Sequence, residues 1–270
     1  MWKILTLLIT AALAACTTTP TGRSQINFMS SAEEMRLGAD AYGEMLAEEK
    51  LITAGPQYQM VQRIGKRIAI AAEDLYPKSP AKDFLWEFSL IDDPKTVNAW
   101  ALPGGKCAVY TGLLAVTQDE DSLAAVMGHE IAHALSHHGA ERMSQNILLQ
   151  GALVGASLSM RDMESGQRQG IMAALGLGAT VGVMLPFSRS HESEADEIGL
   201  YLAAHSGYNP QAAIGLWERM GALSNGAPPE FLSTHPSEET RIERLTEAMP
   251  EAMRLYRKAS ARPEGRREPR

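Results

Sequence analysis

The sequence predicts a mainly α-helical α+β protein with one small sheet of about three strands. From Asp119 onward, apolar residues recur at helical spacing almost to the end of the chain. Aromatic-rich, partly alternating runs, which are typical of strands, are confined to residues 84–110. Hydrophobic residues make up 45% and charged residues 21% of the 270 positions. Such a chain can bury a sizeable core.

Two helices are predicted before the sheet. The capping-box pattern Ser31-Ala-Glu-Glu34 opens the first, which should run to about Lys50. Apolar residues at helical spacing indicate the second, from Tyr58 to Leu75, and Pro77 stops it.

Three strands are predicted next, over residues 84–91, 96–102 and 106–110. The turn Pro103-Gly104-Gly105 separates the last two, so these two should form a hairpin. The sheet should lie over a helix that begins near Asp119.

The N-terminus has the pattern of a lipoprotein signal. Residues 1–15 form a short basic start and an apolar run of about twelve residues, where a membrane span needs roughly 20. The run ends Leu13-Ala-Ala-Cys16, which resembles a bacterial lipobox and implies lipidation of Cys16. Thr17 then favours the periplasmic face of the bacterial outer membrane over the inner membrane. We therefore expect a lipid anchor at Cys16 and a polar tether over residues 16–30; plain secretory cleavage is the alternative.

Residues 31–250 should form one domain with an apolar insert at 147–187. Residues 147–160 and 171–187 are rich in Gly and Ala, and we favour a helical hairpin packed on the body over membrane insertion or a mobile flap. Residues 251–270 read as a basic, disordered tail: from 253 to 270 the net charge is +5, against −7 for the whole chain. The acidic remainder argues against a nucleic-acid partner.

The segment His129-Glu130-Ile-Ala-His133 matches the pattern HExxH. On a helix the two histidines lie on one face, one turn apart, so both can bind a single Zn²⁺. Glu130 lies about 100° round the helix from His129, where it can accept a proton from a zinc-activated water. The pattern predicts one Zn²⁺ per chain, with Glu130 as catalytic base.

His137 and His138 fail as further ligands on a continuous helix. His137 would lie about 12 Å along the axis from His129, and His138 would face the opposite side. A metzincin would need its third histidine at position 139, which is Gly139. Both histidines are interpreted as surface groups or as groups behind the ligands.

The third ligand is sought in Glu192-Ser-Glu194-Ala-Asp196. On a helix Glu192 and Asp196 share one face, while Glu194 points away and should be solvated. Spacing alone also allows a simple acidic surface run.

HExxH, residues 138–142 (HGAER) and residues 192–196 (ESEAD) together resemble the HtpX-like zinc metallopeptidases, which include CAAX prenyl proteases and periplasmic lipoprotein proteases. The resemblance covers residues 31–245, including Asn98-Ala-Trp-Ala-Leu-Pro-Gly-Gly105 and Thr234-His-Pro. It implies a zincin-like core of gluzincin type, with Glu192 as third ligand and Asp196 behind it as a proton donor. It gives His235 two possible roles, as oxyanion stabiliser or as a zinc-binding plug.

Asn98, Ala99, Trp100 and Ala101 resemble the family's edge strand over the cleft, which would bind extended substrate through its backbone; an ordinary hairpin strand is the alternative. The sequence thus predicts a lipid-anchored zinc endopeptidase for misfolded or extended envelope proteins. Two alternatives stay open: a chaperone-like outer-membrane assembly factor with a latched or structural zinc, and a zinc hydrolase of peptidoglycan.

Overall fold

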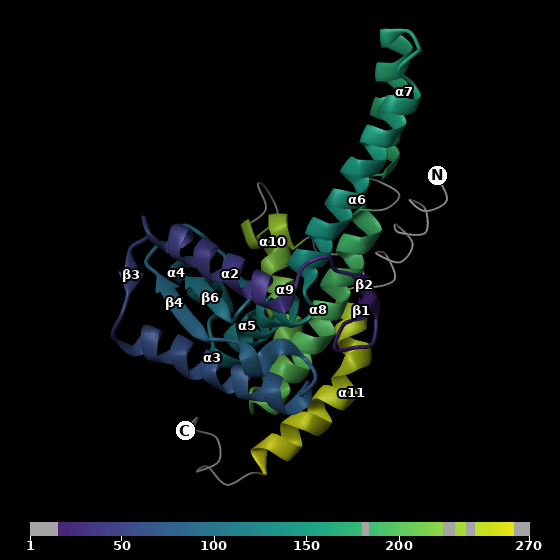
Figure 1. Ribbon diagram of the computed structural model, residues 1–270. Helices are drawn as coiled ribbons and strands as arrows, with labels where there is room; N and C mark the ends of the chain where they lie inside the picture. The colour runs from purple at the N-terminus through teal and green to yellow at the C-terminus, as the bar shows by residue number, and fades with distance from the viewer. Residues whose placement is uncertain (1–15, 180–183, 224–229, 236–240, 262–270) are drawn as a thin grey trace.

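The computed structural model describes residues 16–179, 184–223, 230–235 and 241–261. It shows a helical body around one small sheet, from which a helical hairpin projects (Figure 1). The predicted α+β class, mainly helical with a small sheet, is confirmed. The helices are α2 (Ser31–Leu46), α3 (Pro56–Leu75), α4 (Thr111–Thr117), α5 (Glu120–Leu135), α6 (His138–Ser159), α7 (Ser165–Ala179), α8 (Leu185–His205), α9 (Ala212–Ala222), α10 (Glu230–Thr234) and α11 (Arg241–Ser260).

The sheet of the body has four strands in the order β3-β4-β6-β5. They are β3 (Leu51–Ile52), β4 (Glu87–Ile91), β5 (Ala99–Leu102) and β6 (Lys106–Tyr110). β5 and β6 form the predicted antiparallel hairpin, while β4 runs parallel to β6. β3 was not predicted, because two residues are too few to show alternation. The strand expected over residues 84–91 begins only at Glu87, after a 3₁₀ helix at Pro80–Asp83.

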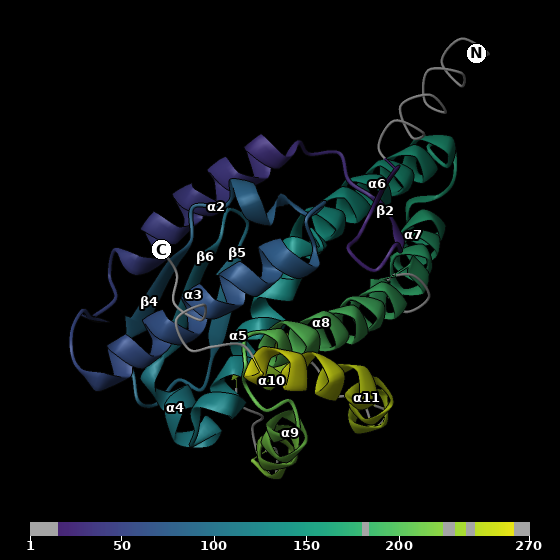
Figure 2. The same ribbon diagram turned by 90° about the horizontal axis from the view of Figure 1, so that it is seen from below.

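Helices cover both faces of this sheet (Figure 2). On one face, Tyr42 of α2 shares a hydrogen bond of 2.8 Å with Ser89 of β4 through their hydroxyls. On the other, the ring of Phe88 lies so close to α3 that a methyl group on Gly65 would come within 2.4 Å of it. Neighbouring residues of a strand point to opposite faces, so α2 and α3 enclose β4 between them. Helix α5 packs on α3 and on β5.

The start of α2 differs from the prediction by one residue. Its N-cap is Ser30, whose hydroxyl accepts a hydrogen bond from the backbone N–H of Glu33. The predicted pair, Ser31 and Glu34, lies inside the helix, and α2 ends at Leu46, before Lys50. The sequence pattern predicts the helix but not its N-cap, because Ser30 with Glu33 and Ser31 with Glu34 both match the capping-box spacing.

Helices α5 and α8 cross in direct backbone contact next to the HExxH segment. A methyl group built on Gly128 would lie 2.6 Å from the carbonyl oxygen of Gly199. One built on Gly199 would lie 2.6 Å from the backbone nitrogen of His129. Only glycine allows this approach, since any side chain would force the two helices apart. The crossing brings Glu192, about two turns before Gly199, close to His129.

The segment expected to be a polar tether contains a short hairpin. β1 (Cys16–Thr18) pairs antiparallel with β2 (Ser24–Ile26), and Gln25 is buried. Arg23, in the turn, forms ion pairs with Glu141 and Glu194 of the body. The expected disordered tail is likewise ordered in part, because α11 continues to Ser260 and residues 262–270 lie outside the described residues.

The apolar insert forms the helical hairpin α6–α7, which extends away from the body (Figure 1). The buried residues of α6 are all in its first seven positions, the last being Ser144. The distal part therefore does not pack on the body, in contrast to our expectation. Residues 180–183 of the insert lie outside the described residues. Among the helices that the structure describes, none is long and apolar enough to span a membrane.

Candidate metal centre and active site

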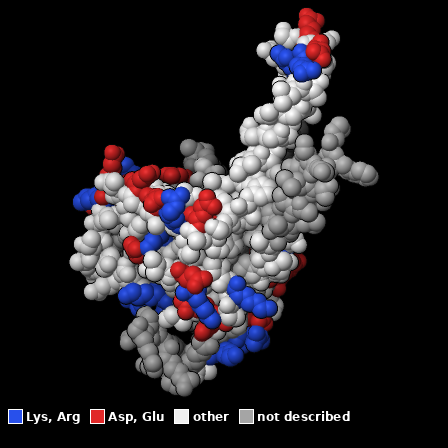
Figure 3. All heavy atoms as spheres, viewed as in Figure 1, with Lys and Arg blue, Asp and Glu red and all other residues white. Residues whose placement is uncertain are grey.

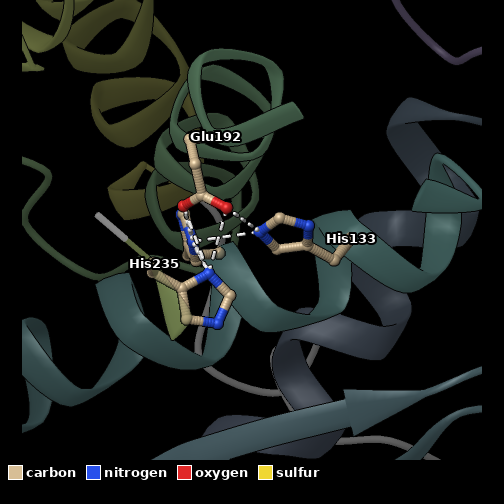
Figure 4. Close-up of side chains that lie close together, drawn as sticks. His133, Glu192 and His235 are labelled. Carbon is tan, nitrogen blue, oxygen red and sulfur yellow. Dashed lines mark hydrogen bonds and ion pairs between the residues drawn. The ribbon is translucent and has the colours of Figure 1, made fainter. Parts of the chain in front are cut away.

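Helix α5 presents the HExxH side chains to α8 and α10. His129 and Glu130 are buried, and His133 is nearly so. Glu192 of α8 and His235, the residue after α10, face the same point (Figure 4). One nitrogen or oxygen from each of His129, His133, Glu192 and His235 lies within 4.8 Å of the others. The structure thus brings together the three predicted metal ligands and His235.

The separations between these atoms fit a tetrahedral metal site. Nε2 of His129 lies 3.1 Å from Nε2 of His133 and 3.3 Å from Nδ1 of His235. Glu192 oxygens lie 3.4 Å from His129, 3.5 Å from His133 and 3.1 Å from His235. Two ligands about 2.0–2.1 Å from one tetrahedral Zn²⁺ are about 3.3–3.4 Å apart. Three imidazoles and a carboxylate are also ligands that Zn²⁺ accepts.

The electrostatics around His129 suit a cation. Burial alone would lower its pKa, but the carboxylates of Asp196 and Glu192 outweigh burial and raise it to about 10. Asp196 Oδ1 lies 2.9 Å from Nδ1 of His129, on the side of the ring away from the ligand cluster. The negative charge that favours a proton on this imidazole equally favours a divalent metal.

Glu130 lies beside the ligand cluster without being part of it. Its carboxylate is 3.5 Å from Nε2 of His235. Burial raises its pKa, while the charges of His235 and His129 and the backbone of Ala101 in β5 partly offset this. A raised pKa brings a carboxylate closer to the range in which it can take up and release a proton at neutral pH.

Sequence reasoning missed Arg241, at the start of α11. Its Nε donates to Asp196 at 2.6 Å, its Nη2 donates to Glu192 at 3.0 Å, and its guanidinium stacks 3.9 Å from the ring centre of Trp217. The side chain is buried. It thus balances two carboxylates of the site. Arg241 lies more than 100 residues after HExxH, so no spacing rule connects the two. The sequence signal for its role was its position shortly after the Thr234-His-Pro motif.

His137 and His138 were assigned on the assumption of a continuous helix, and that assumption is wrong. α5 ends at Leu135, and His137 adopts the left-handed conformation, with φ at +56°. Its Nδ1 contacts Glu34 at 2.8 Å. The chain then turns so that His138, buried at the start of α6, lies with its Nδ1 2.9 Å from Nδ1 of His133. Neither is a ligand, and His138 lies directly behind one.

Glu194 is buried, in contrast to the solvated position expected for it. It lies 3.1 Å from Nε2 of His138 and accepts a hydrogen bond of 2.8 Å from Arg23. Burial raises its pKa, but hydrogen bonds from His138 and the N-terminal hairpin lower it to about 2 overall. Burial also lowers the pKa of His138 to about 4, despite its contact with Glu194. A neutral His138 therefore connects Glu194 to His133.

The predicted substrate strand, β5, is an edge of the sheet. The side chain of Asn98 bonds to the backbone N–H of Ala99 and to Glu230 of α10. Ala101 follows with its backbone close to Glu130. Trp100 packs edge-to-face on Tyr42 of α2. The edge from Ala99 to Leu102 thus runs beside the ligand cluster.

A model of peptidase family M48 matches residues 56–249, which is more than half of the chain and includes every residue of the cluster. The chain belongs to peptidase family M48. The resemblance to HtpX-like zinc metallopeptidases is confirmed at this level.

Several curated proteins resemble this M48 chain over most of its length. Mitochondrial metalloendopeptidase OMA1 of Schizosaccharomyces pombe is 39% identical over 237 residues, covering 85% of this chain and 65% of the relative. The Arabidopsis thaliana protein of the same name is 40% identical over 181 residues, which cover 65% of this chain and 34% of the relative. The beta-barrel assembly-enhancing protease of Escherichia coli is 31% identical over 230 residues, which cover 82% of this chain and 45% of the relative. The chain thus spans less than two thirds of the length of these relatives.

The predicted location, on the outer membrane of a bacterium, is contradicted. Most of the similar proteins are mitochondrial endopeptidases, two of which are 39% and 40% identical to this chain, whereas the Escherichia coli protease is 31% identical. The prediction depended on the short pattern at residues 13–16, which carries far less information than an alignment of more than 200 residues. Lipidation of Cys16, the first residue of β1, stays a prediction.

Proposed function

We propose that this M48 chain is a zinc-dependent endopeptidase that cleaves extended or misfolded proteins, as in protein quality control. The observation that carries the proposal is the cluster of four ligand atoms at tetrahedral separations, with the buried Glu130 beside it. The names of the relatives, which describe metalloendopeptidases and a protease, support the reaction class.

In this proposal His129, His133 and Glu192 hold the metal. A zinc ion bound there would polarise the scissile carbonyl and lower the pKa of a water molecule. Glu130 takes the proton from the attacking water and returns it to the leaving amine, for which its raised pKa suits it. Asp196 faces Nδ1 of His129 and is paired with Arg241. That placement indicates that Asp196 orients the ring of His129, and it favours this role more than the predicted role of Asp196 as a proton donor.

Substrate would bind as an added strand along β5. The free edge from Ala99 to Leu102 offers backbone groups that can pair with any extended segment, so affinity would depend little on sequence. Its position beside Glu130 would hold the scissile bond close to the catalytic base.

The proposal is tested by incubating the zinc-loaded protein with denatured casein, native casein and peptidoglycan sacculi. We expect cleavage of denatured casein, and its loss when a zinc chelator is added. Release of muropeptides from sacculi without casein cleavage would instead support a hydrolase of peptidoglycan. Absence of both activities, with zinc bound, would support the chaperone-like alternative.

His235 should restrain this activity. Its Nδ1 lies 3.3 Å from His129 and 3.1 Å from Glu192, where a fourth ligand would stand in place of water. We therefore expect His235→Ala to raise the rate of casein cleavage several-fold. The control is His205→Ala, at the end of α8, where the histidine contacts the exposed Asp74. A loss of about 10²–10³-fold would show instead that His235 stabilises the oxyanion.

A further inference from the structure

The distal hairpin, defined as residues 145–177, exposes an unusual amount of apolar surface. Ile147, Val154 and Leu158 of α6 are 60%, 58% and 66% exposed, and Leu177 of α7 is 67% exposed. No residue between 143 and 160 or between 169 and 188 is charged. In Figure 3 the projecting stalk is accordingly white, with charged groups only at its tip. Contiguous apolar surface of this kind marks an interaction site.

The apolar residues are not confined to one side of the hairpin. On α6, Ile147, Val154 and Leu158 form one stripe, while Leu148 lies about 100° round the helix from Ile147. On α7, Leu175 and Leu177 are also exposed and lie about 200° apart. A folded protein partner would cover one side and leave the others in water. Lipid molecules can rearrange around several sides of a partly embedded element, so this distribution favours a lipid surface.

The base of the hairpin lies where the chain leaves its N-terminal apolar run. The backbone N–H of Phe28, just after β2, donates to Ser144 of α6 at 3.0 Å. β2 pairs with β1, which begins at Cys16. Residues 4–15, apolar by sequence, are joined directly to this strand. Two apolar segments thus start from the same part of the molecule, and two weak membrane signals acting together give stable attachment.

We propose that the distal hairpin is a lipid-binding element that lies in the boundary between headgroups and acyl chains. It is too short to span: α6 from Ser144 to Ser159 measures about 24 Å, against about 30 Å of hydrocarbon. Its tip, made of the turn and the start of α7, carries Arg161, Asp162, Glu164 and Arg168, which sum to zero charge and stay at headgroup level. Because this tip is neutral overall and the chain is acidic, anionic headgroups would not attract the element. We therefore propose that it binds zwitterionic lipid.

The test uses the full chain with Leu158→Cys and attaches an environment-sensitive fluorophore to the thiol at position 158. Cys16→Ser removes the other accessible thiol, and Cys107 is buried and does not react. The matched control carries Leu85→Cys, at a side chain that is 75% exposed on the body. With phosphatidylcholine vesicles we expect a blue shift at position 158 only, unchanged by salt. Adding Ile147→Glu and Val154→Glu should weaken vesicle binding of the probe at least about tenfold.

Two results would overturn the proposal. One is an identical spectrum at position 158 with and without vesicles. The other is a blue shift that grows with protein concentration in the absence of lipid, which would show that a second copy of the chain covers the hairpin. Because the readout is local to position 158, attachment through residues 1–16 alone, with the hairpin left in water, gives no blue shift there.

A second inference concerns the N-terminal hairpin, and it rests on the proposed metal site. His133 Nδ1 contacts His138 Nδ1 at 2.9 Å, and His138 Nε2 contacts Glu194 at 3.1 Å. Arg23 donates to Glu194 at 2.8 Å, and the hydroxyls of Thr19 and Thr21 also donate to it. Thr19, Thr21 and Arg23, which hold this carboxylate on the side away from His138, all come from the turn between β1 and β2.

The protons of this chain can be arranged in only one way when His133 binds metal through Nε2. Nδ1 of His133 must then carry a hydrogen, which it donates to Nδ1 of His138. His138 in turn carries its hydrogen on Nε2 and donates it to Glu194. We infer that Glu194, held by the N-terminal hairpin, is a positioning residue that fixes the ring of His133 through His138. Such partners commonly contribute ten- to hundredfold to metal affinity.

The test compares zinc dissociation constants of Glu194→Gln and Glu141→Gln. Both carboxylates are buried and both accept from Arg23, but only Glu194 contacts His138. We expect Glu194→Gln to weaken zinc binding about ten- to hundredfold and Glu141→Gln to leave it nearly unchanged. Equal losses in both variants would mean a general structural effect and overturn the inference. If the unsubstituted chain binds no zinc, that result contradicts the proposed function itself, and not only the role of Glu194.

Discussion

Glu130→Gln is expected to abolish measurable cleavage of denatured casein while leaving zinc binding intact. The amide keeps the shape of the side chain but cannot take the proton of the attacking water. Loss of general base catalysis alone lowers rates about 10²–10⁴-fold. Glu130 lies outside the group of four ligand atoms, so the metal should stay in place. The measurement is the casein cleavage rate of both proteins after zinc loading.

The environment of Glu130 makes this variant informative. The carboxylate is buried between His235 and β5, and one of its oxygens, Oε1, has no hydrogen-bond partner. The amide keeps an oxygen that can accept the hydrogen bond from the backbone of Ala101, so a lost activity cannot be ascribed to misfolding if zinc content is preserved. Retention of cleavage would show that another group activates the water.

Arg241→Met is expected to destabilise the metal-free protein by about 3–5 kcal/mol. The substitution removes the guanidinium that the buried carboxylates of Glu192 and Asp196 share and leaves them His129 as their common cation. Removing one member of a buried ion network is costly because the remaining charges are desolvated and only partly balanced. The measurement is urea unfolding of the zinc-free chain.

A matched control lies on the same helix. Arg254 pairs with Glu251, and both are exposed, so Arg254→Met should change the free energy of unfolding by less than about 1 kcal/mol. Equal effects of the two substitutions would contradict the account of Arg241. Zinc should reduce the loss for Arg241→Met, since the metal supplies positive charge next to Glu192.

The parts of the fold and site that follow from local pattern could be predicted. His129, Glu130 and His133 share one continuous stretch of α5, so helical geometry alone places them together. The β5–β6 hairpin likewise follows from its turn. Glu192 needed the family resemblance, because the spacing of acidic residues on α8 could not distinguish it from Glu194.

The remaining parts depend on contacts between segments far apart in the chain. Glu194 appeared to point to solvent on a lone helix, but the N-terminal hairpin covers it. His138 was placed by extending α5, and a single left-handed residue, His137, redirected it. Arg241 reaches the site from α11. No periodicity within a segment carries such information, since each position is decided by packing of the whole chain.

The central claim is that His129, His133 and Glu192 bind one zinc ion per chain. The direct measurement is the zinc content of purified protein by mass spectrometry, after zinc loading and removal of excess metal, for the unsubstituted chain and for Glu192→Gln and His133→Ala. We predict one zinc ion per chain, and its loss from both variants while their far-ultraviolet circular dichroism is unchanged. An unsubstituted chain without zinc, or variants that keep a full equivalent, would contradict the account.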